Sequence, residues 1–299
     1  MSSLLRLATL FLFSAGSADA GPKEITFCHY NVENYLSEEL PREGQKFGVR
    51  AKPEAEIEAL VQIIREIAPD ILGICEMGSR ERFADFQHRL ARAGLEYAEA
   101  EYVDGPDQSR HLGLFSRFPI VARHSRVDVP FELSGLPEKV RRGILDVVVQ
   151  VTPDYRLRLV GVHLKSKLPS PEGEALIRRF EAQQVRRHVE AILVAERGLN
   201  LLCYGDFNDT KNEPTFQEIS GVRGTPGFLS DLPAADDRGD RWTHYWKVAD
   251  VYSRIDYLFA SPGLIGEVVK NSAKVYGASR WKDASDHRPI FARISPVDR

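Results

Sequence analysis

Acidic, amide and imidazole side chains recur at or beside the ends of apolar runs in this chain of 299 residues. Carboxylate and amide oxygens gathered at strand ends suit a hard divalent cation. Histidines at the same edge suit proton transfer or phosphate binding. The combination predicts a metal-dependent phosphoester hydrolase. The segments that carry it are Tyr30–Asn34, Ile74–Glu76, Val162–Ser166, Tyr204–Asp209, Arg254–Leu258 and Ser285–Pro289.

Glu76 follows the apolar run Ile71–Cys75 without a spacer. A glutamate at the end of a buried strand is costly unless it is paired or bound to a metal. A helical pattern follows, however, so Glu76 could instead be an acidic residue at a helix N-terminus, where the helix dipole favours it. These two interpretations stay open at this point.

Asp206 and Asn208 end the apolar run Leu201–Gly205. Their i, i+2 spacing points both side chains the same way in an extended chain. A carboxylate beside an amide can hold a metal-bound phosphate oxygen or an attacking water. The alternative is a simple turn, because Gly, Asp and Asn all favour turns.

Asp286 and His287 precede a proline and a final apolar run. Asp256, in another predicted strand, could fix the ring orientation of His287, as a carboxylate does for an imidazole base. An ion pair between Asp256 and Arg254 is the alternative on spacing alone, since exposed ion pairs are common and weak.

His163 ends the apolar run Leu157–Val162. A lone histidine in such a place is more often structural. Lys165 and Lys167 follow it and would supply positive charge for a phosphate, which favours a role in the site.

Helices and strands that would position these residues follow from the apolar periodicity. Helical spacing predicts helices over Glu54–Ala68, Arg80–Ala93 and Glu172–Arg197, and the last should turn its arginines to solvent. Strand-like runs come in pairs rather than alternating strictly with helices, which favours an α/β fold of packed sheets with helices outside over a uniform βαβ barrel. The arginines concerned are Arg178, Arg179, Arg186 and Arg187.

The ordered set N-x-x-N, E, H-x-K-S, G-D-F-N-D, R-I-D-Y-L-F and S-D-H-R-P runs from Tyr30 to Pro289. As a set it resembles the endonuclease/exonuclease/phosphatase superfamily, whose members are deoxyribonuclease I-like. The resemblance implies a four-layer sandwich of two mixed β-sheets flanked by helices. It also implies Mg²⁺, or Mn²⁺, as the cofactor.

Site roles follow from the resemblance position by position. It implies Asn31, Glu76 and Asp286 as metal-site residues, and Arg110 as a residue that binds a substrate phosphate. Asp206 would orient or deprotonate the attacking water, and Asn208 would bond the phosphate. His287, oriented by Asp256, would bind the phosphate or transfer a proton, and His163 matches a second histidine of the deoxyribonuclease-like branch.

The first twenty residues have the pattern of an export signal. The apolar stretch Leu7–Phe13 is too short to span a bilayer, and Ala18-Asp19-Ala20 is a cleavage pattern. We predict a signal peptide over residues 1–20, one domain over residues 21–299, and a secreted or periplasmic protein. The formal net charge of −3 neither supports nor excludes a nucleic-acid substrate, because a weakly acidic protein can have a basic cleft.

The expected function is an exported Mg²⁺-dependent nuclease that acts on DNA or RNA, as a monomer without membrane insertion. The alternative is a phosphodiesterase or phosphatase on lipid or inositol phosphates, similar to a sphingomyelinase, for which Gly227–Leu229 is a modest apolar contact segment. A non-catalytic binding protein is disfavoured, because clustered carboxylates are costly to keep. Trp281 could stack on a base or simply pack.

Three cysteines, Cys28, Cys75 and Cys203, lie in or beside apolar runs, and no CxxC pattern is present. They are interpreted as small buried hydrophobes. A disulfide stays possible for an exported chain.

Overall fold

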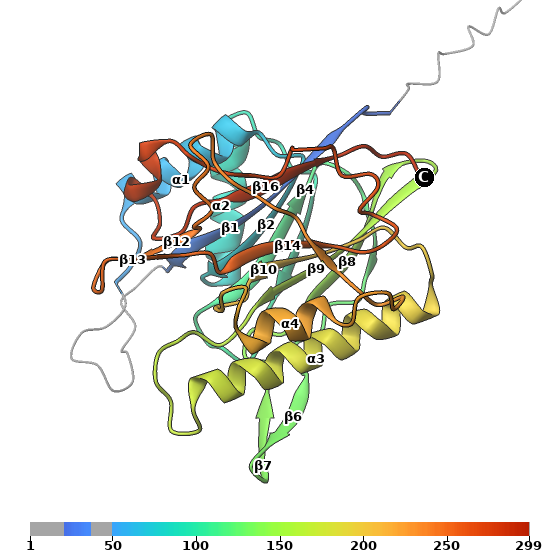
Figure 1. Ribbon diagram of the computed structural model, residues 1–299. Helices are drawn as coiled ribbons and strands as arrows, with labels where there is room; N and C mark the ends of the chain where they lie inside the picture. Colours follow the sequence, from blue (N-terminus) through green and yellow to red (C-terminus); the bar gives the residue numbers. More distant parts are fainter. Residues whose placement is uncertain (1–20, 37–49, 299) are drawn as a thin grey trace, which may run out of the picture.

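The computed structural model describes residues 21–36 and 50–298, so the proposed signal peptide lies outside the described residues. Two six-stranded sheets pack face to face in this part of the chain (Figure 1). The first has the spatial order β15 (Lys274–Val275), β16 (Ile290–Ile294), β1 (Ile25–Tyr35), β2 (Ile71–Met77), β4 (His111–Ser116) and β3 (Glu99–Val103). The second has the order β11 (Ser230–Asp231), β14 (Asp256–Ala260), β10 (Leu201–Asp206), β9 (Tyr155–His163), β8 (Leu145–Thr152) and β5 (Ile120–Arg123).

Helices cover the outer face of each sheet, which confirms the predicted four-layer α/β sandwich (Figure 1). Helices α1 (Glu54–Ile67) and α2 (Arg80–Arg92) pack on the first sheet. Helices α3 (Glu174–Ala195) and α4 (Pro214–Ser220) pack on the second. The short α4 was not predicted, because seven residues give too little apolar periodicity to separate a helix from a loop.

Two small hairpins project from the sandwich at separate places (Figure 1). One joins β6 (Pro130–Leu133) to β7 (Leu136–Lys139) beyond α3, and the other joins β12 (His244–Trp246) to β13 (Val251–Ser253). A 3₁₀-helix, η1 (Ser279–Asp283), precedes the loop that leads into β16.

Strand direction brings the chemistry-bearing residues to one edge of the sandwich. Strands β1 and β2 are parallel, and so are β9 and β10, so each pair ends at the same edge. Strand β14 runs antiparallel to β10, and its first residue Asp256 pairs with the last residue of β10, Asp206. Asp206 also pairs with His163, the last residue of β9. The second sheet therefore places these three polar side chains in neighbouring positions.

Tyr204 fills the space between the two sheets and requires glycine on both sides. A Cβ atom on Gly73 would lie 2.3 Å from the Tyr204 ring, and a Cβ atom on Gly161 would lie 2.6 Å from the Tyr204 hydroxyl. Both contacts are far below van der Waals separation, so alanine at either position would push the ring or the sheet aside. Tyr204 thus packs closely against Gly73 of the first sheet and Gly161 of the second.

The prediction that the arginines of α3 face solvent is wrong for two of the four, and the structure decides between the two roles left open for Trp281. Arg178 and Arg186 are buried rather than solvent-facing: Arg178 donates to the Lys165 carbonyl, and Arg186 donates to the Gly227 carbonyl. Trp281 is also buried and packs edge-on against Trp242 at a ring distance of 5.1 Å. Trp281 therefore packs and offers no open face to a base.

All three cysteines lie in the described part of the chain, and each is free and buried. Burial raises the pKa of the Cys203 thiol to about 12, and it raises the pKa of Cys28 and Cys75 as well. Because the thiolate is the reactive form, the native protein should react with no equivalent of a thiol reagent, and the denatured protein with three. Colorimetric thiol titration with and without guanidinium measures both numbers, and a fast-reacting thiol in the native protein would contradict the structure.

Candidate active site

Glu76 is aimed into the site by an irregularity in β2. The pairing register of β1 with β2 shifts between Asn31 and Tyr35, and Glu76 has φ 61°. Bulges and such left-handed positions commonly re-aim a side chain beside a functional site. Helix α2 begins later, at Arg80, and is capped by the Ser79 hydroxyl. The alternative that Glu76 serves a helix N-terminus is therefore not supported.

The environment of Glu76 keeps it ionised. The Asn34 backbone N–H donates to Oε2 at 2.9 Å, and the Arg110 Nε lies 3.8 Å from the same oxygen. Burial alone would raise the pKa of Glu76, but the positive charge of Arg110 and other nearby groups outweighs burial and brings the pKa to about 2. An ionised carboxylate in a fixed position is what a divalent cation requires.

Asn31 presents its amide nitrogen, not its oxygen, to the centre of the site. Nδ2 lies 3.3 Å from Oε1 of Glu76 and 3.1 Å from Oδ2 of Asp206, while Oδ1 accepts the Glu33 backbone N–H at 3.0 Å. A cation would bind the oxygen, which has a second lone pair beside the one used by the Glu33 N–H. Asn31 thus links Glu76 to Asp206 as a hydrogen-bond donor, and its role at the metal site stays a prediction.

Glu33 is a site carboxylate that the sequence reasoning missed. Its Oε2 accepts the Asp286 backbone N–H at 3.0 Å and lies 3.9 Å from the Lys52 amine. Burial, together with the negative charge of Asp286, raises the pKa of Glu33 to about 7. Its position two residues after Asn31 was the available signal, although the chain leaves the extended conformation there, with φ 44° at Glu33.

Asp206 is a buried carboxylate whose proton affinity is increased. Burial and the negative charge of Asp256 raise its pKa to about 7. Its Oδ1 accepts the Asn208 backbone N–H at 2.8 Å, and its Oδ2 lies 3.6 Å from Nε2 of His163. A carboxyl group with a pKa near neutrality can accept a proton from water and later release it.

Asp256 orients His287, as predicted. Oδ2 of Asp256 lies 2.8 Å from Nδ1 of His287. Burial alone would lower the pKa of His287, but the negative charge of Asp256 outweighs burial and raises it. The alternative partner, Arg254, pairs instead with Asp231 at 2.6 Å. The other oxygen of Asp256 lies 3.2 Å from Nε2 of His29, which is also buried.

His287 therefore turns its Nε2 toward the centre. That atom lies 3.4 Å from Nδ2 of Asn31 and 3.7 Å from Oδ2 of Asp206. The opposite nitrogen of the ring is held by Asp256, which sets the orientation of the ring.

His163 lies on the floor of the site in the neutral form. Burial and the positive charge of Arg142 lower its pKa to about 3. Its Nε2 is 3.8 Å from Oε1 of Glu76. Asn208, with φ 53°, donates from Nδ2 to the Leu164 carbonyl at 3.0 Å, which leaves one amide hydrogen for another acceptor.

Arg142 was not singled out in the sequence. Its guanidinium is buried and pairs with Asp107 at 2.9 Å, but Nε and Nη1 have no hydrogen-bond partner within the described residues. A buried cation with free donors is costly unless an anion satisfies it. Arg142 therefore joins Arg110 as a residue suited to a phosphate oxygen.

The other predicted cations are already engaged. Nζ of Lys165 donates to the Ser166 carbonyl at 3.0 Å, and Nζ of Lys167 lies 2.9 Å from Glu213. Lysines close in sequence to the motifs thus stabilise loops, and the positive charge nearest the site comes from Arg110 and Arg142.

Carboxylates near the centre of the site suit a hard divalent cation. Glu33, Glu76 and Asp286 come from three segments, and the negative charges of Asp286 and Glu76 both raise the pKa of Glu33. Like charges near one another favour a bound cation. Asp206 is a further acid at the centre, whereas Asp256 has both oxygens committed to histidines.

Comparison with known proteins agrees with this geometry. A family model described as Endonuclease/Exonuclease/phosphatase family matches residues 28–287. Comparison with curated protein sequences gave no match.

Several solved structures share the fold. The human Nocturnin catalytic domain is 18% identical, with a TM-score of 0.65 over 92% of this chain and 95% of that chain. A truncated Caenorhabditis elegans TDP2 is 18% identical, with a TM-score of 0.61 over 91% and 97%. Sphingomyelinase C from Streptomyces griseocarneus is 16% identical, with a TM-score of 0.60 over 91% and 99%. With the match over residues 28–287, the chain belongs to the endonuclease/exonuclease/phosphatase family of metal-dependent phosphoesterases.

Proposed function

We propose that this protein hydrolyses phosphodiester bonds of DNA or RNA with Mg²⁺ or Mn²⁺. The observation that carries the proposal is the convergence of Glu76, Asp206 and the His287–Asp256 pair at one edge of the sandwich. Asn31 links the first two, and Arg110 and Arg142 add positive charge. Clustered oxygen donors favour a hard cation over zinc at the carboxylate site.

Each site residue has its own role in the proposed hydrolysis. Asp206, with its pKa near neutrality, accepts a proton from the attacking water, and Asn208 holds a phosphate oxygen through its remaining amide hydrogen. His287, kept protonated by Asp256, donates from Nε2 to an oxygen of the phosphate. A bound divalent cation supplies neutralisation of the developing negative charge. The pKa values of Asp206 and His287 are both raised, so near neutral pH the carboxylate can act as a base while the imidazolium acts as an acid.

An exposed tryptophan beside the site supports a nucleic-acid substrate. Trp246 is 54% exposed and pairs with Val251 across the β12–β13 hairpin. It lies two residues from His244, on the same face of the strand and about 7 Å further along. Tyr245 points the other way and stacks on Tyr252. An aromatic face of this kind can stack on a base next to the cleaved phosphate.

The same hairpin also favours the lipid alternative, in which it would contact a membrane surface. Val248 is 87% exposed at its turn, and Tyr252 is 49% exposed. One structural neighbour is named a sphingomyelinase C. The apolar segment Gly227–Leu229 gives no support, because Leu229 is buried. No helix among the described residues meets the length and hydropathy needed to cross a membrane.

Replacing Trp246 by alanine should separate these substrates. Loss of one stacked base should weaken binding of single-stranded oligonucleotides. KM should therefore rise by roughly 5- to 150-fold, with little change in kcat. Leu136→Ala, at an exposed apolar residue on the β6–β7 hairpin, is the matched control. Unchanged oligonucleotide kinetics, with a loss confined to sphingomyelin vesicles, would favour the lipid alternative.

Assays of the purified protein with Mg²⁺ test the function itself. Plasmid DNA, RNA, sphingomyelin vesicles and a chromogenic phosphodiester should be compared at one enzyme concentration, with Asp206→Asn as the inactive reference. We expect cleavage of nucleic acid and of the chromogenic ester. Activity on sphingomyelin alone would overturn the proposal of a nuclease, but it would agree with phosphoesterase activity.

Export is part of the proposal. Leu7–Phe13 and the Ala18-Asp19-Ala20 pattern support cleavage after Ala20 and a secreted or periplasmic domain that begins at Gly21. Intact-mass analysis of protein from a secreting host measures the mature N-terminus. A mature chain that still begins at Met1 would contradict export.

A further inference from the structure

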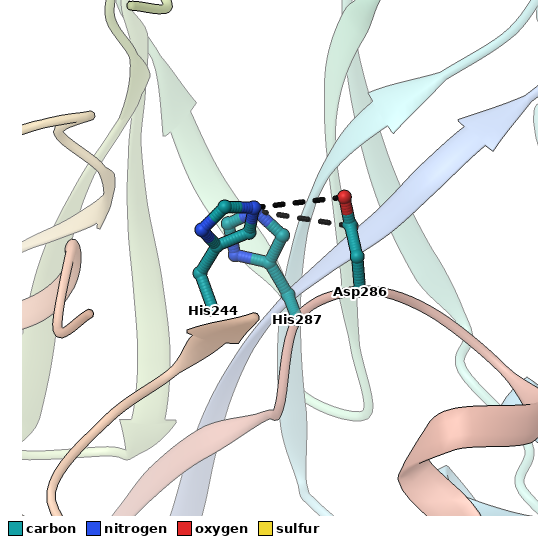
Figure 2. A group of neighbouring side chains, drawn as sticks. All are labelled: His244, Asp286 and His287. Carbon is teal, nitrogen blue, oxygen red and sulfur yellow. Dashed lines mark ion pairs between the residues drawn. The ribbon is translucent and has the colours of Figure 1, made fainter. Parts of the chain in front are cut away.

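We propose that His244 joins Asp286 and His287 of the catalytic centre in a zinc site, and that Zn²⁺ bound there switches off hydrolysis. The three side chains face one another in Figure 2. Nε2 of His244 lies 3.6 Å from Asp286, Nε2 of His287 lies 4.0 Å from it, and the three potential ligand atoms all lie within 4.8 Å of one another. The inhibitory part rests on the proposed function, and the binding part does not.

The two imidazoles are already oriented for a metal. Nδ1 of His287 is held by Asp256 at 2.8 Å, and Nδ1 of His244 lies 3.5 Å from the Ser253 hydroxyl. Nε2 of His244 is thus left to face Asp286, and Nε2 of His287 faces the centre of the site, with Asp286 at 4.0 Å. Partners on the far nitrogen of a ligating histidine fix its tautomer and ring orientation, and they are a regular feature of zinc sites.

Backbone hydrogen bonds hold His244 against the loop of Asp286 and His287. The Tyr245 N–H donates to the Asp286 carbonyl at 2.9 Å, and the Arg288 N–H donates to the Thr243 carbonyl at 2.6 Å. Strand β12 and the loop thus form one rigid unit. The ligands come from segments more than forty residues apart, but these hydrogen bonds fix the distance between the two backbone segments.

Ligand chemistry favours zinc over magnesium here. Two imidazole nitrogens and one carboxylate are a common zinc set, and neighbouring ligand atoms of a tetrahedral zinc ion lie about 3.3 Å apart. The two distances to Asp286, 3.6 and 4.0 Å, are within about 1 Å of that value, and the two imidazole nitrogens lie at most 4.8 Å apart. Side-chain rotations would bring the three ligands onto one ion. A fourth position would remain for water.

The site is also open to solvent. The side chain of Asp286 is 42% exposed and that of His244 is 20% exposed. The other acid and histidine group within the described residues, Asp206, Asp256 and His287, is buried, and both oxygens of Asp256 are occupied. The exposed group is therefore the one that a metal from solution can reach.

Zinc at this site would disable the catalytic imidazole. A metal on Nε2 of His287 occupies the atom that would otherwise contact the phosphate, and it also engages Asp286. His244 itself takes no part in the proposed hydrolysis. Removing His244 should therefore weaken zinc binding and zinc inhibition together, while hydrolysis with magnesium is kept.

Calorimetric titration of metal-free protein with Zn²⁺, in excess Mg²⁺, tests the site directly. We expect one zinc ion per chain in wild-type protein and in Glu76→Gln, and at least about tenfold weaker binding in His244→Ala. His124→Ala, at an exposed histidine elsewhere, is the matched control and should bind as wild type does. Titration with Co²⁺ should give strong visible ligand-field bands in wild-type protein and lose them in His244→Ala.

Inhibition is measured on the chromogenic phosphodiester with Mg²⁺ at saturation. Zinc should inhibit the wild-type enzyme, and the inhibitory concentration should rise at least about tenfold in His244→Ala. Equal zinc affinity in His244→Ala and wild type would overturn the site. Binding without inhibition would overturn its regulatory role. Absence of hydrolysis on every substrate would contradict the proposed function instead, and calorimetry would still decide the site.

Discussion

Replacing Glu76 by alanine should lower kcat by roughly 10³-fold or more, because loss of the cation removes several kcal/mol of charge stabilisation at the phosphate. The fold should persist, since Glu76 contributes a carboxylate and no apolar packing to the sandwich. Steady-state kinetics on the chromogenic phosphodiester and circular dichroism measure the two effects. Glu196→Ala, at an exposed glutamate beyond α3, is the control and should keep full activity.

Thermal unfolding gives a second test that needs no substrate. A ligand that binds only the native state raises the melting temperature as its concentration increases. Millimolar Mg²⁺ should therefore stabilise the wild-type protein and leave Glu76→Ala unchanged. Full hydrolysis after exhaustive chelation, or an equal Mg²⁺ shift in both proteins, would refute a metal held by Glu76.

His287→Ala should lower kcat by roughly 10²–10⁴-fold, the usual contribution of general acid–base catalysis. Asp256→Ala should lose activity through the same imidazole, because its Oδ2 lies 2.8 Å from Nδ1 of His287. Groups that act as one unit are not additive. The double variant should therefore be hardly slower than His287→Ala alone.

The control for this cycle is His88→Ala, at an exposed histidine of α2, which should behave as wild type. A variant of His29 gives a further test of the role of Asp256. Because His29 contacts the other oxygen of Asp256 at 3.2 Å, His29→Ala should show a smaller loss that disappears in the Asp256→Ala background. Losses that multiply in the His287 and Asp256 double variant would show that Asp256 acts independently of the imidazole.

The layered fold could be predicted from local patterns. Apolar residues at helical spacing identified α1, α2 and α3, and the continuous apolar run of β2 indicated a strand buried on both faces. Helix α4 could not be predicted, because two turns of helix carry too little periodicity. Burial of Arg178 and Arg186 was also missed, since their partners are carbonyl and carboxylate groups of distant loops.

For the site, residue type and position at strand ends determined which side chains could do chemistry, and Glu76, Asp206 and His287 indeed lie together. Only the tertiary structure decided how they are oriented. It turns the Asn31 nitrogen inward, brings Glu33 beside Asp286, and adds His29 and Arg142, which no motif indicated. It also places His244, from the β12–β13 hairpin, against the loop of His287. The physical reason is that strand-end chemistry is local in sequence, whereas bulges, rotamers and partners depend on contacts between segments far apart in the chain.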